Sequence, residues 1–240
     1  MKPAGASEGD LRGAGPEAYR RGMRTVIAGG HGRIALRLER LLAARGDEVA
    51  GLVRHPGQGD DLRAAGAEPL VCDLESAPVE EVAAHLAGAD AAVFAAGAGP
   101  GSGADRKDTV DRAAAVLFAD AAERAGVRRL LVVSSMGADP GHRGDEVFDV
   151  YLRAKGAADA DVLARAGLDV TVLRPGALTD DPGTGRVRLE ASTGRGGVSR
   201  DDVAAVLAEL LDTPATAGLT LELVAGPTPV AVAVKAVAGN

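Results

Sequence analysis

A tyrosine and a lysine near the middle of the chain have a spacing that suits proton transfer. Tyr151 and Lys155 stand four residues apart in the segment YLRAK, and side chains at i and i+4 lie above one another on one face of a helix. A lysine ammonium beside a tyrosine favours the phenolate, which makes the hydroxyl a better acid and base near neutral pH. The pair is therefore a catalytic candidate. The alternative is a helix face that lines a cleft without proton transfer.

A second candidate is the glycine-rich segment VIAGGHGRIA. Gly29, Gly32 and Ala35 follow a G-x-x-G-x-x-A spacing between an expected strand and an expected helix. Small residues at such a turn let the backbone approach a pyrophosphate, which the amide groups at the helix N-terminus then bind. We expect a dinucleotide-binding loop, and the alternative is a tight turn without a ligand. The other residues of this expected loop are Gly30, His31, Arg33 and Ile34.

The end of the second expected strand indicates which dinucleotide is preferred. Enzymes that bind NAD usually carry an acidic residue there, which holds the adenosine ribose. This chain has LVRHP instead, and Arg54, with help from Arg33 and His55, offers positive charge to a 2′-phosphate. We therefore expect NADP(H) to be favoured over NAD(H). The alternative for Arg54 is a solvated residue at a strand end.

Apolar runs that suit buried strands alternate with helical patterns, and this alternation predicts the elements that position these residues. Six strand and helix alternations run from about residue 24 to residue 175, with glycine at most helix ends. The pattern is typical of an α/β protein with a doubly wound parallel sheet, the Rossmann fold. Ligands of such sheets bind at the carboxyl ends of the strands.

We expect a single domain over residues 23–240, preceded by a flexible extension over residues 1–22 that lacks the apolar run of a signal peptide. Beyond residue 175 the pattern weakens into a small substrate-side region. Residues 183–192 suit a strand, residues 199–212 suit a helix capped by Ser199, and residues 219–226 suit a last strand. The tail over residues 229–239 fits either a strand or a helix period.

Composition argues against several classes of partner. The net charge is -7 and aromatic residues make up 2% of the 240 residues, so we expect no nucleic acid and no membrane partner. A lone cysteine, Cys72, cannot form an internal disulfide, which fits a reducing, cytoplasmic compartment. We expect Cys72 to be a core residue and the four histidines to form no metal site. The expected partner is a small-molecule substrate, and monomer and homodimer both stay open.

These motifs together resemble a known family. The glycine loop, CDL after the third strand, AAGAG after the fourth, SSMG after the fifth, YLRAK and LRPG follow one another. In this order they resemble the short-chain dehydrogenases/reductases, most closely the atypical NAD(P)-binding branch near the NmrA-like and biliverdin reductase B-like proteins. The resemblance covers about residues 24–226 and is more specific for fold and cofactor than for substrate.

The resemblance implies roles for further residues. Asp73 and Leu74 would flank the adenine, and Ser135 would be the catalytic serine, with Ser134 beside it. Lys155 would hold the nicotinamide ribose as well as act on Tyr151. Two further sets are implied: Ala95, Ala96, Gly97 and Ala98 would line the cofactor, and Pro175, Gly176 and Ala177 would lie near the nicotinamide amide.

One residue of the classical family site is missing. The fourth catalytic residue of the family is an asparagine, and the only asparagine here is the terminal Asn240. Asp111 lies in the comparable region, and its alternative is an ordinary exposed helix acid. A complete classical proton relay is therefore not expected from the sequence.

Three functions follow in order of preference. The first is an NADP(H)-dependent oxidoreductase that transfers hydride to or from a small-molecule carbonyl or similar acceptor. The second is an NAD(P)-dependent epimerase or dehydratase, which is disfavoured because only residues 176–240 remain to form a substrate domain. The third is a non-catalytic NAD(P)-binding redox sensor of the NmrA-like kind. The loops that shape the substrate pocket carry no motif that names the substrate.

Overall fold

The structure is a computed structural model that describes residues 22–99 and 101–239, so all of the expected extension except Gly22 lies outside the described residues. Its strands are β1 (Arg24–Ala28), β2 (Glu48–Val53), β3 (Glu68–Val71), β4 (Ala91–Phe94), β5 (Arg129–Val133), β6 (Asp169–Pro175), β7 (Ala177–Thr179), β8 (Arg186–Glu190), β9 (Gly197–Ser199), β10 (Thr220–Ala225) and β11 (Thr228–Pro229). Its α-helices are α1 (Arg33–Ala44), α2 (Gly59–Ala64), α3 (Val79–Leu86), α4 (Ala104–Arg106), α5 (Ala114–Ala125), α6 (Val147–Leu163), α7 (Arg200–Leu211) and α8 (Val230–Ala238). A π-helix (Lys107–Ala113) joins α4 to α5, and two short 3₁₀ helices span Pro56–Gln58 and Pro214–Thr216.

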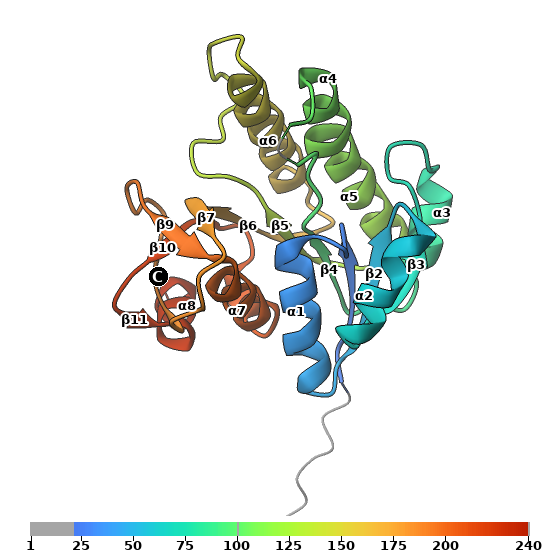
Figure 1. Cartoon of the computed structure of the whole chain (residues 1–240), viewed down its shortest axis with the longest axis horizontal. Coiled ribbons are helices and arrows are strands. Elements are labelled where there is room, and N and C mark those ends of the chain that lie inside the picture. The colour runs from blue at the N-terminus through green and yellow to red at the C-terminus, as the bar shows by residue number, and fades with distance from the viewer. Residues whose placement is uncertain (1–21, 100, 240) are drawn as a thin grey trace, which may run out of the picture.

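Nine of the strands form one sheet in the order β11-β8-β10-β6-β5-β4-β1-β2-β3 (Figure 1), and β7 and β9 form a separate parallel pair. All pairings from β10 to β3 are parallel, and β8 pairs antiparallel with β10 and β11. The predicted doubly wound parallel sheet is therefore confirmed. Because the chain runs outward from β1 to β3 and then returns to β4 on the other side of β1, a crevice opens at the carboxyl ends of β1 and β4.

Helices cover both faces of the sheet. On one face α1, α7 and α8 pack over residues such as Ile27, and on the other α3, α5 and α6 pack over Val26 and Ala28. This alternation along β1 is the period of two that a strand buried on both faces requires. No helix in the described ranges is long and apolar enough to cross a membrane.

The region beyond residue 175 follows the expected order. Residues 186–190 form the expected strand β8, and Ser199 caps α7 by accepting a hydrogen bond from the Asp202 backbone N–H at 3.0 Å. The ambiguous tail is a helix, although valine is a strand-favouring residue. Val230, Ala233, Val234 and Val237 face the core at helical spacing, so burial of this face decides its conformation.

Candidate functional site

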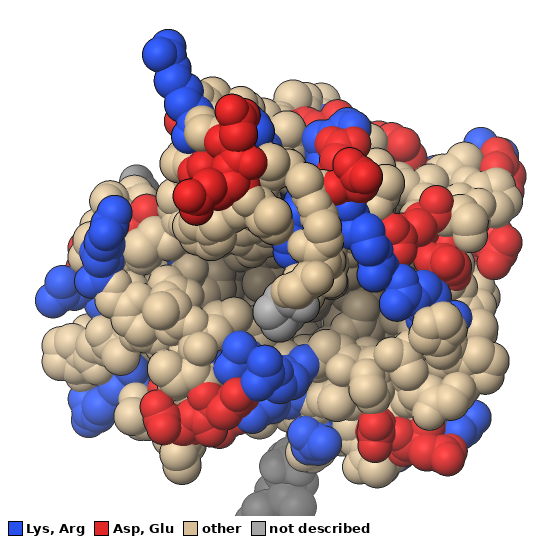
Figure 2. All heavy atoms as spheres, turned by 45° about the horizontal axis from the view of Figure 1, so that its top comes forward, with Lys and Arg blue, Asp and Glu red and all other residues tan. Residues whose placement is uncertain are grey.

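Two adjoining cavities open at the carboxyl ends of the strands, and Figure 2 shows this face hollowed at its centre with basic side chains around its rim. The first has a volume of about 290 Å³ and lies between the glycine loop, the end of β2 and the loops after β3 and β4. The second, of about 560 Å³, lies beside α6 and the π-helix. Four residues line both cavities, so the two are continuous; they are Gly32, Ala95, Ala96 and Gly97.

The glycine loop forms the wall at this junction. Gly29 has φ of +77°, and a Cβ added there would lie 2.6 Å from the Ala96 Cα, so only glycine fits this turn. Gly32 is the N-cap of α1, whose first turn carries no acidic residue. The unpaired amide groups of that turn therefore face the cavities without a competing carboxylate, which suits a pyrophosphate.

The glycine loop lies between a strand and a helix, as predicted, and its binding of a dinucleotide stays a prediction. The loop joins β1 to α1, and small residues from it and from the loop after β4 leave a narrow cradle for an extended ligand. Gly29, His31 and Gly32 line the first cavity, whereas Arg33 and Ile34 line the second. Gly30 packs inward: a Cβ there would lie 2.8 Å from the Gly51 Cα.

A buried acidic residue packs against the glycine loop. Glu39 on α1 is fully buried, and neither of its carboxyl oxygens has a hydrogen-bond partner among the described residues. It packs against Gly30 and Gly51, where added Cβ atoms would lie 3.0 and 2.7 Å from its Oε1. Burial, opposed only in part by Arg40, raises the pKa of Glu39 to about 8.

This acid should make folding stability fall as pH rises. Between about pH 4.5 and about pH 8 the folded chain keeps a proton on Glu39 that the unfolded chain releases, so the free energy of unfolding decreases across that window. We expect Glu39→Gln to raise the thermal midpoint more at pH 8 than at pH 5. Glu48→Gln, at an exposed position on β2, is the control. An equal shift of the Glu39→Gln midpoint at both pH values would contradict this account.

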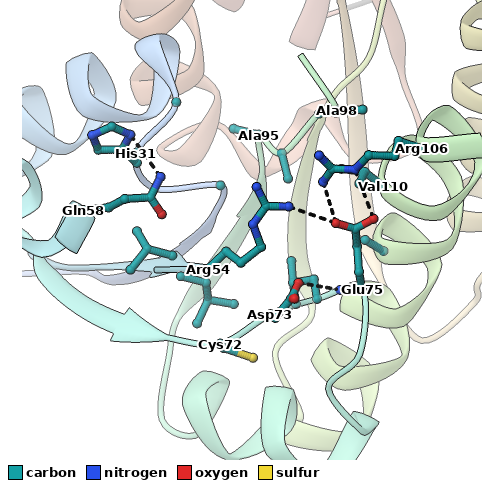
Figure 3. A pocket seen from close by; sticks show the side chains of 18 residues that line it. His31, Arg54, Gln58, Cys72, Asp73, Glu75, Ala95, Ala98, Arg106 and Val110 are labelled. Atoms are coloured by element: carbon teal, nitrogen blue, oxygen red, sulfur yellow. Dashed lines mark hydrogen bonds and ion pairs between the residues drawn. The ribbon is translucent and has the colours of Figure 1, made fainter. Parts of the chain in front are cut away.

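Arg54 reaches the first cavity from the end of β2, as expected. Its side chain is 42% exposed, and Nη1 donates a hydrogen bond to Glu75 Oε2 at 3.1 Å (Figure 3). His55 receives a hydrogen bond from Arg54 Nε at 3.2 Å but does not line either cavity. Asp73 and Leu74, after β3, line the first cavity, and their contact with an adenine stays a prediction.

Arg33 lies in a different place from the one expected for it near Arg54. It lines the second cavity and pairs with Asp180, which also accepts from Arg37 and from Arg200 Nη1 at 2.9 Å. Asp180 is thus an ion-pair centre that ties α1 to the start of α7. Arg33 cannot serve a phosphate at Arg54 while it is held there.

Lys155 and Asp111 form a buried pair in the wall of the second cavity. The Lys155 Nζ lies 3.4 Å from Asp111 Oδ1, and their side chains are 4% and 0% exposed. Lys155 also donates to the carbonyl oxygens of Val133 at 3.1 Å and Ala96 at 3.5 Å. The interpretation of Asp111 as an ordinary exposed acid is therefore wrong, because the π-helix turns it inward. Ala98 donates its backbone N–H to Asp111 Oδ2 at 3.3 Å.

Tyr151 lines the same cavity but has its own aromatic and cationic neighbours. Its ring stacks on Phe148 with 5.8 Å between centroids, and the Lys107 Nζ lies 5.2 Å from the centre of the ring. Lys107 is almost fully buried and donates to the Gly99 carbonyl at 2.9 Å. Two ammonium groups, from Lys107 and Lys155, therefore line the cavity that Tyr151 faces.

The two serines after β5 do not take the places that we expected. Ser134 lines the second cavity, but its hydroxyl donates to the buried Asp159 Oδ2 at 2.8 Å, which Arg174 also binds. Ser135 lies outside the lining of both cavities, and its hydroxyl donates to the Met136 carbonyl at 3.3 Å. Its catalytic role stays a prediction that would require the hydroxyl to rotate.

The segment after β6 also lies differently from its expected place. Pro175, which ends β6, and the next two residues, Gly176 and Ala177, line neither cavity. The Gly176 and Ala177 N–H groups donate to the carbonyl oxygens of Leu223 and Gly196. The next residue, Leu178, lines the second cavity instead. The nicotinamide contact of this segment stays a prediction.

One histidine, His85, lies close to two other residues that could bind a metal ion. Donor atoms of Cys72, Glu81 and His85 lie within 4.8 Å of one another, which the sequence spacing did not indicate because β3 and α3 bring them together. Burial first, and then Glu81, raise the pKa of the Cys72 thiol to about 11. The thiol is therefore protonated at neutral pH in the metal-free chain, and a metal ion would have to displace this proton to bind here. Cys72 is buried, as predicted.

Several residues that line the cavities were not predicted from the sequence. Among them are Glu75, Arg106, Lys107 and Phe148. Signals for two of them were present: Lys107 stands four residues before Asp111, and Phe148 stands three before Tyr151, both helical spacings. The π-helix gave no sequence signal, although such segments are frequent at functional sites.

The fold and the two cavities define a Rossmann-type protein that binds a nicotinamide dinucleotide. The family described as NAD(P)H-binding matches residues 29–214, and the chain belongs to this family. It fits the atypical short-chain dehydrogenase/reductase branch that the motifs resemble.

Known relatives span nearly the whole chain. The uncharacterized sugar epimerase YhfK of Bacillus subtilis is 38% identical over 214 residues, which are 89% of this chain and 99% of that protein. A solved Bacillus halodurans protein with a provisional NAD-dependent epimerase/dehydratase name is 37% identical with a TM-score of 0.82, covering 90% and 100% of the two chains. The oxidoreductase ylbE of Lactococcus lactis is 26% identical with a TM-score of 0.79, covering 91% and 98%.

Proposed function

We propose that the protein is an NADP(H)-dependent oxidoreductase that transfers hydride to or from a small-molecule carbonyl or a similar acceptor. The observation that carries the proposal is the junction of the two cavities at Gly32, Ala95, Ala96 and Gly97. The first cavity has the glycine loop and Arg54 expected for a phosphorylated adenosine, and the second has acid/base groups. The residues at the junction are small, so a long ligand can pass from one cavity to the other.

The residues present fit a nicotinamide dinucleotide. The N-terminus of α1 and the glycine loop would hold the pyrophosphate, and Arg54 would hold the 2′-phosphate. When bound, the cofactor supplies or accepts hydride. Lys155, fixed by Asp111, places a positive charge in the wall of the second cavity, where it can bind hydroxyl groups and stabilise an oxyanion.

Tyr151 is the proposed proton donor to the acceptor oxygen. Tyr151 lines the second cavity, and its ring contacts both Phe148 and Lys107. The ammonium groups of Lys107 and Lys155 line the same cavity as Tyr151, where they would stabilise negative charge on an acceptor oxygen. The cavity's remaining wall is largely apolar, with Val147, Phe148 and Leu178 at its exposed edge, which suits an uncharged or conjugated acceptor.

Epimerase or dehydratase chemistry is the second candidate, and the names of the two Bacillus proteins favour it. Such an enzyme takes a hydride from its substrate and returns it, so the cofactor shows no net oxidation. Net oxidation of NADPH by a panel of carbonyl compounds and quinones distinguishes the two functions. A redox sensor without turnover would bind the nucleotide and oxidise none of it with any acceptor.

The cofactor preference is tested at Arg54. We expect NADPH to bind at least several-fold more tightly than NADH, because only NADPH offers a phosphate to the guanidinium. Arg54→Ala should narrow this difference while changing the NADH affinity little. Isothermal titration of both nucleotides measures it, with Arg63→Ala, an exposed arginine on α2 paired with Asp60, as the control. Equal affinities of the wild type for both nucleotides would overturn the NADP(H) preference.

A further inference from the structure

One carboxylate lies where the expected 2′-phosphate and its arginine would meet. Glu75, just after the adenine-side residues Asp73 and Leu74, lines the first cavity together with Arg54 and Arg106. Figure 3 shows the Arg54 guanidinium extended across the cavity towards Glu75, with Arg106 reaching the same carboxylate from the opposite side.

The contacts of Glu75 are unequal. Arg106 donates twice, from Nη2 to Oε2 at 2.5 Å and from Nε to Oε1 at 3.4 Å. Thr109 adds a hydroxyl hydrogen bond to Oε1 at 2.8 Å, whereas Arg54 contributes one hydrogen bond at 3.1 Å. Arg106 and Thr109 therefore fix the carboxylate in place, and Arg54 is its more weakly held partner.

The net charge of the group formed by Arg54, Arg106 and Glu75 depends on whether the Glu75 carboxyl is ionised. Burial alone would raise the pKa of Glu75, but hydrogen bonds from Arg106 and Thr109 and the charges of both arginines outweigh it and lower the pKa. Glu75 is therefore ionised at neutral pH. Two guanidinium groups and one carboxylate leave a single positive charge to meet a phosphate that carries nearly two negative charges.

We infer that Glu75 is an internal competitor for Arg54 and thereby sets how strongly the protein prefers NADPH over NADH. Arg54 must leave Glu75 to bind the 2′-phosphate, while Arg106 and Thr109 keep the carboxylate nearby, where it repels that phosphate. A ligand without the 2′-phosphate does not require this exchange. The inference rests on the proposed NADP(H) function and names the residue that limits its selectivity.

The test compares 2′,5′-ADP with 5′-AMP, which differ by the 2′-phosphate and do not reach into the second cavity. We expect Glu75→Gln to tighten 2′,5′-ADP binding by roughly three- to tenfold, as expected for removal of one nearby partly solvated charge. Binding of 5′-AMP should change less than twofold. Asp108→Asn is the matched control, because Asp108 is an exposed acid of the π-helix that pairs with Arg112 and lines neither cavity.

A double variant identifies the mechanism. In an Arg54→Ala background the gain from Glu75→Gln should be clearly smaller, because competition for that guanidinium is then absent and only the repulsion between Glu75 and the phosphate is removed. Thermal midpoints confirm that each variant is folded, and Glu75→Ala serves as the second variant if Glu75→Gln is unstable.

Three results would overturn the inference. The first is unchanged or weaker binding of 2′,5′-ADP to Glu75→Gln, and the second is an equal gain in the Arg54→Ala background. The third is weaker 5′-AMP binding, which would show that Glu75 holds the ribose instead. Failure of the proposed function is a different outcome, namely a wild-type protein that binds neither NADPH nor NADH.

Discussion

Gly32→Val should abolish nucleotide binding and leave a folded protein. Gly32 lines both cavities at their junction, so a branched side chain there would occupy the space that a pyrophosphate needs. The backbone at Gly32 has φ of -67° and ψ of 148°, which any residue can adopt. An added Cβ meets only the Gly29 carbonyl oxygen closely, at 3.0 Å. We expect at least a hundredfold loss of NADPH affinity with a small change in the thermal midpoint.

The control for this substitution is Gly57→Val. Gly57 lies in the 3₁₀ helix after β2, close to the same cavity but not in its lining, and an added Cβ there has open space around it. This variant should bind NADPH like the wild type. Retained binding by folded Gly32→Val would show that the glycine loop is only a turn.

Tyr151→Phe should lower turnover by a factor of ~10² or more while NADPH affinity stays nearly unchanged. The substitution removes only the hydroxyl, so the stack on Phe148 and the contact with Lys107 keep the ring in place. Steady-state kinetics with any acceptor found in the panel, together with titration of NADPH, measure the two effects separately. Unchanged turnover would rule out Tyr151 as the proton donor and make Asp111 the first group to test.

Tyr151 gives a cleaner test than Lys155. Removal of Lys155 would leave the carboxylate of Asp111 buried without its ammonium partner, a change that typically destabilises a protein strongly. Loss of activity in a Lys155 variant would therefore mix catalysis with folding. The hydroxyl of Tyr151 can be removed without leaving a buried charge.

The sequence was sufficient to predict the fold up to β6 because its signals there are local. Three kinds of signal depend only on neighbouring residues: strands with alternating or continuous apolar residues, glycine at helix ends, and the G-x-x-G-x-x-A loop. The tail after Pro229 could not be assigned, because β-branched valines at 230, 232, 234 and 237 suit both structures. Only packing of the helix against β8 and α7 settles it.

Several residues that line the site could be predicted from the sequence, but their hydrogen bonds and ion pairs could not. Tyr151, Lys155, Asp111 and Arg54 do line the two cavities. The contact of Glu75 with Arg106 joins residues 31 positions apart, and the pair of Arg33 with Asp180 joins residues 147 apart. Such contacts depend on how loops meet at the edge of the sheet, which no local pattern specifies.

We propose that this chain binds NADPH and passes its hydride to an acceptor in the adjoining cavity. The most direct test is a reaction with NADPH that carries deuterium at the transferable C4 position, over a panel of carbonyl compounds and quinones, with mass spectrometry of the products. We predict that an alcohol formed from a carbonyl compound will carry deuterium on carbon in proportion to the NADP⁺ formed, whereas reduction of a quinone is followed by NADPH oxidation, because its O–D groups exchange with water. A protein that binds NADPH tightly but leaves it unoxidised with every acceptor would contradict the claim.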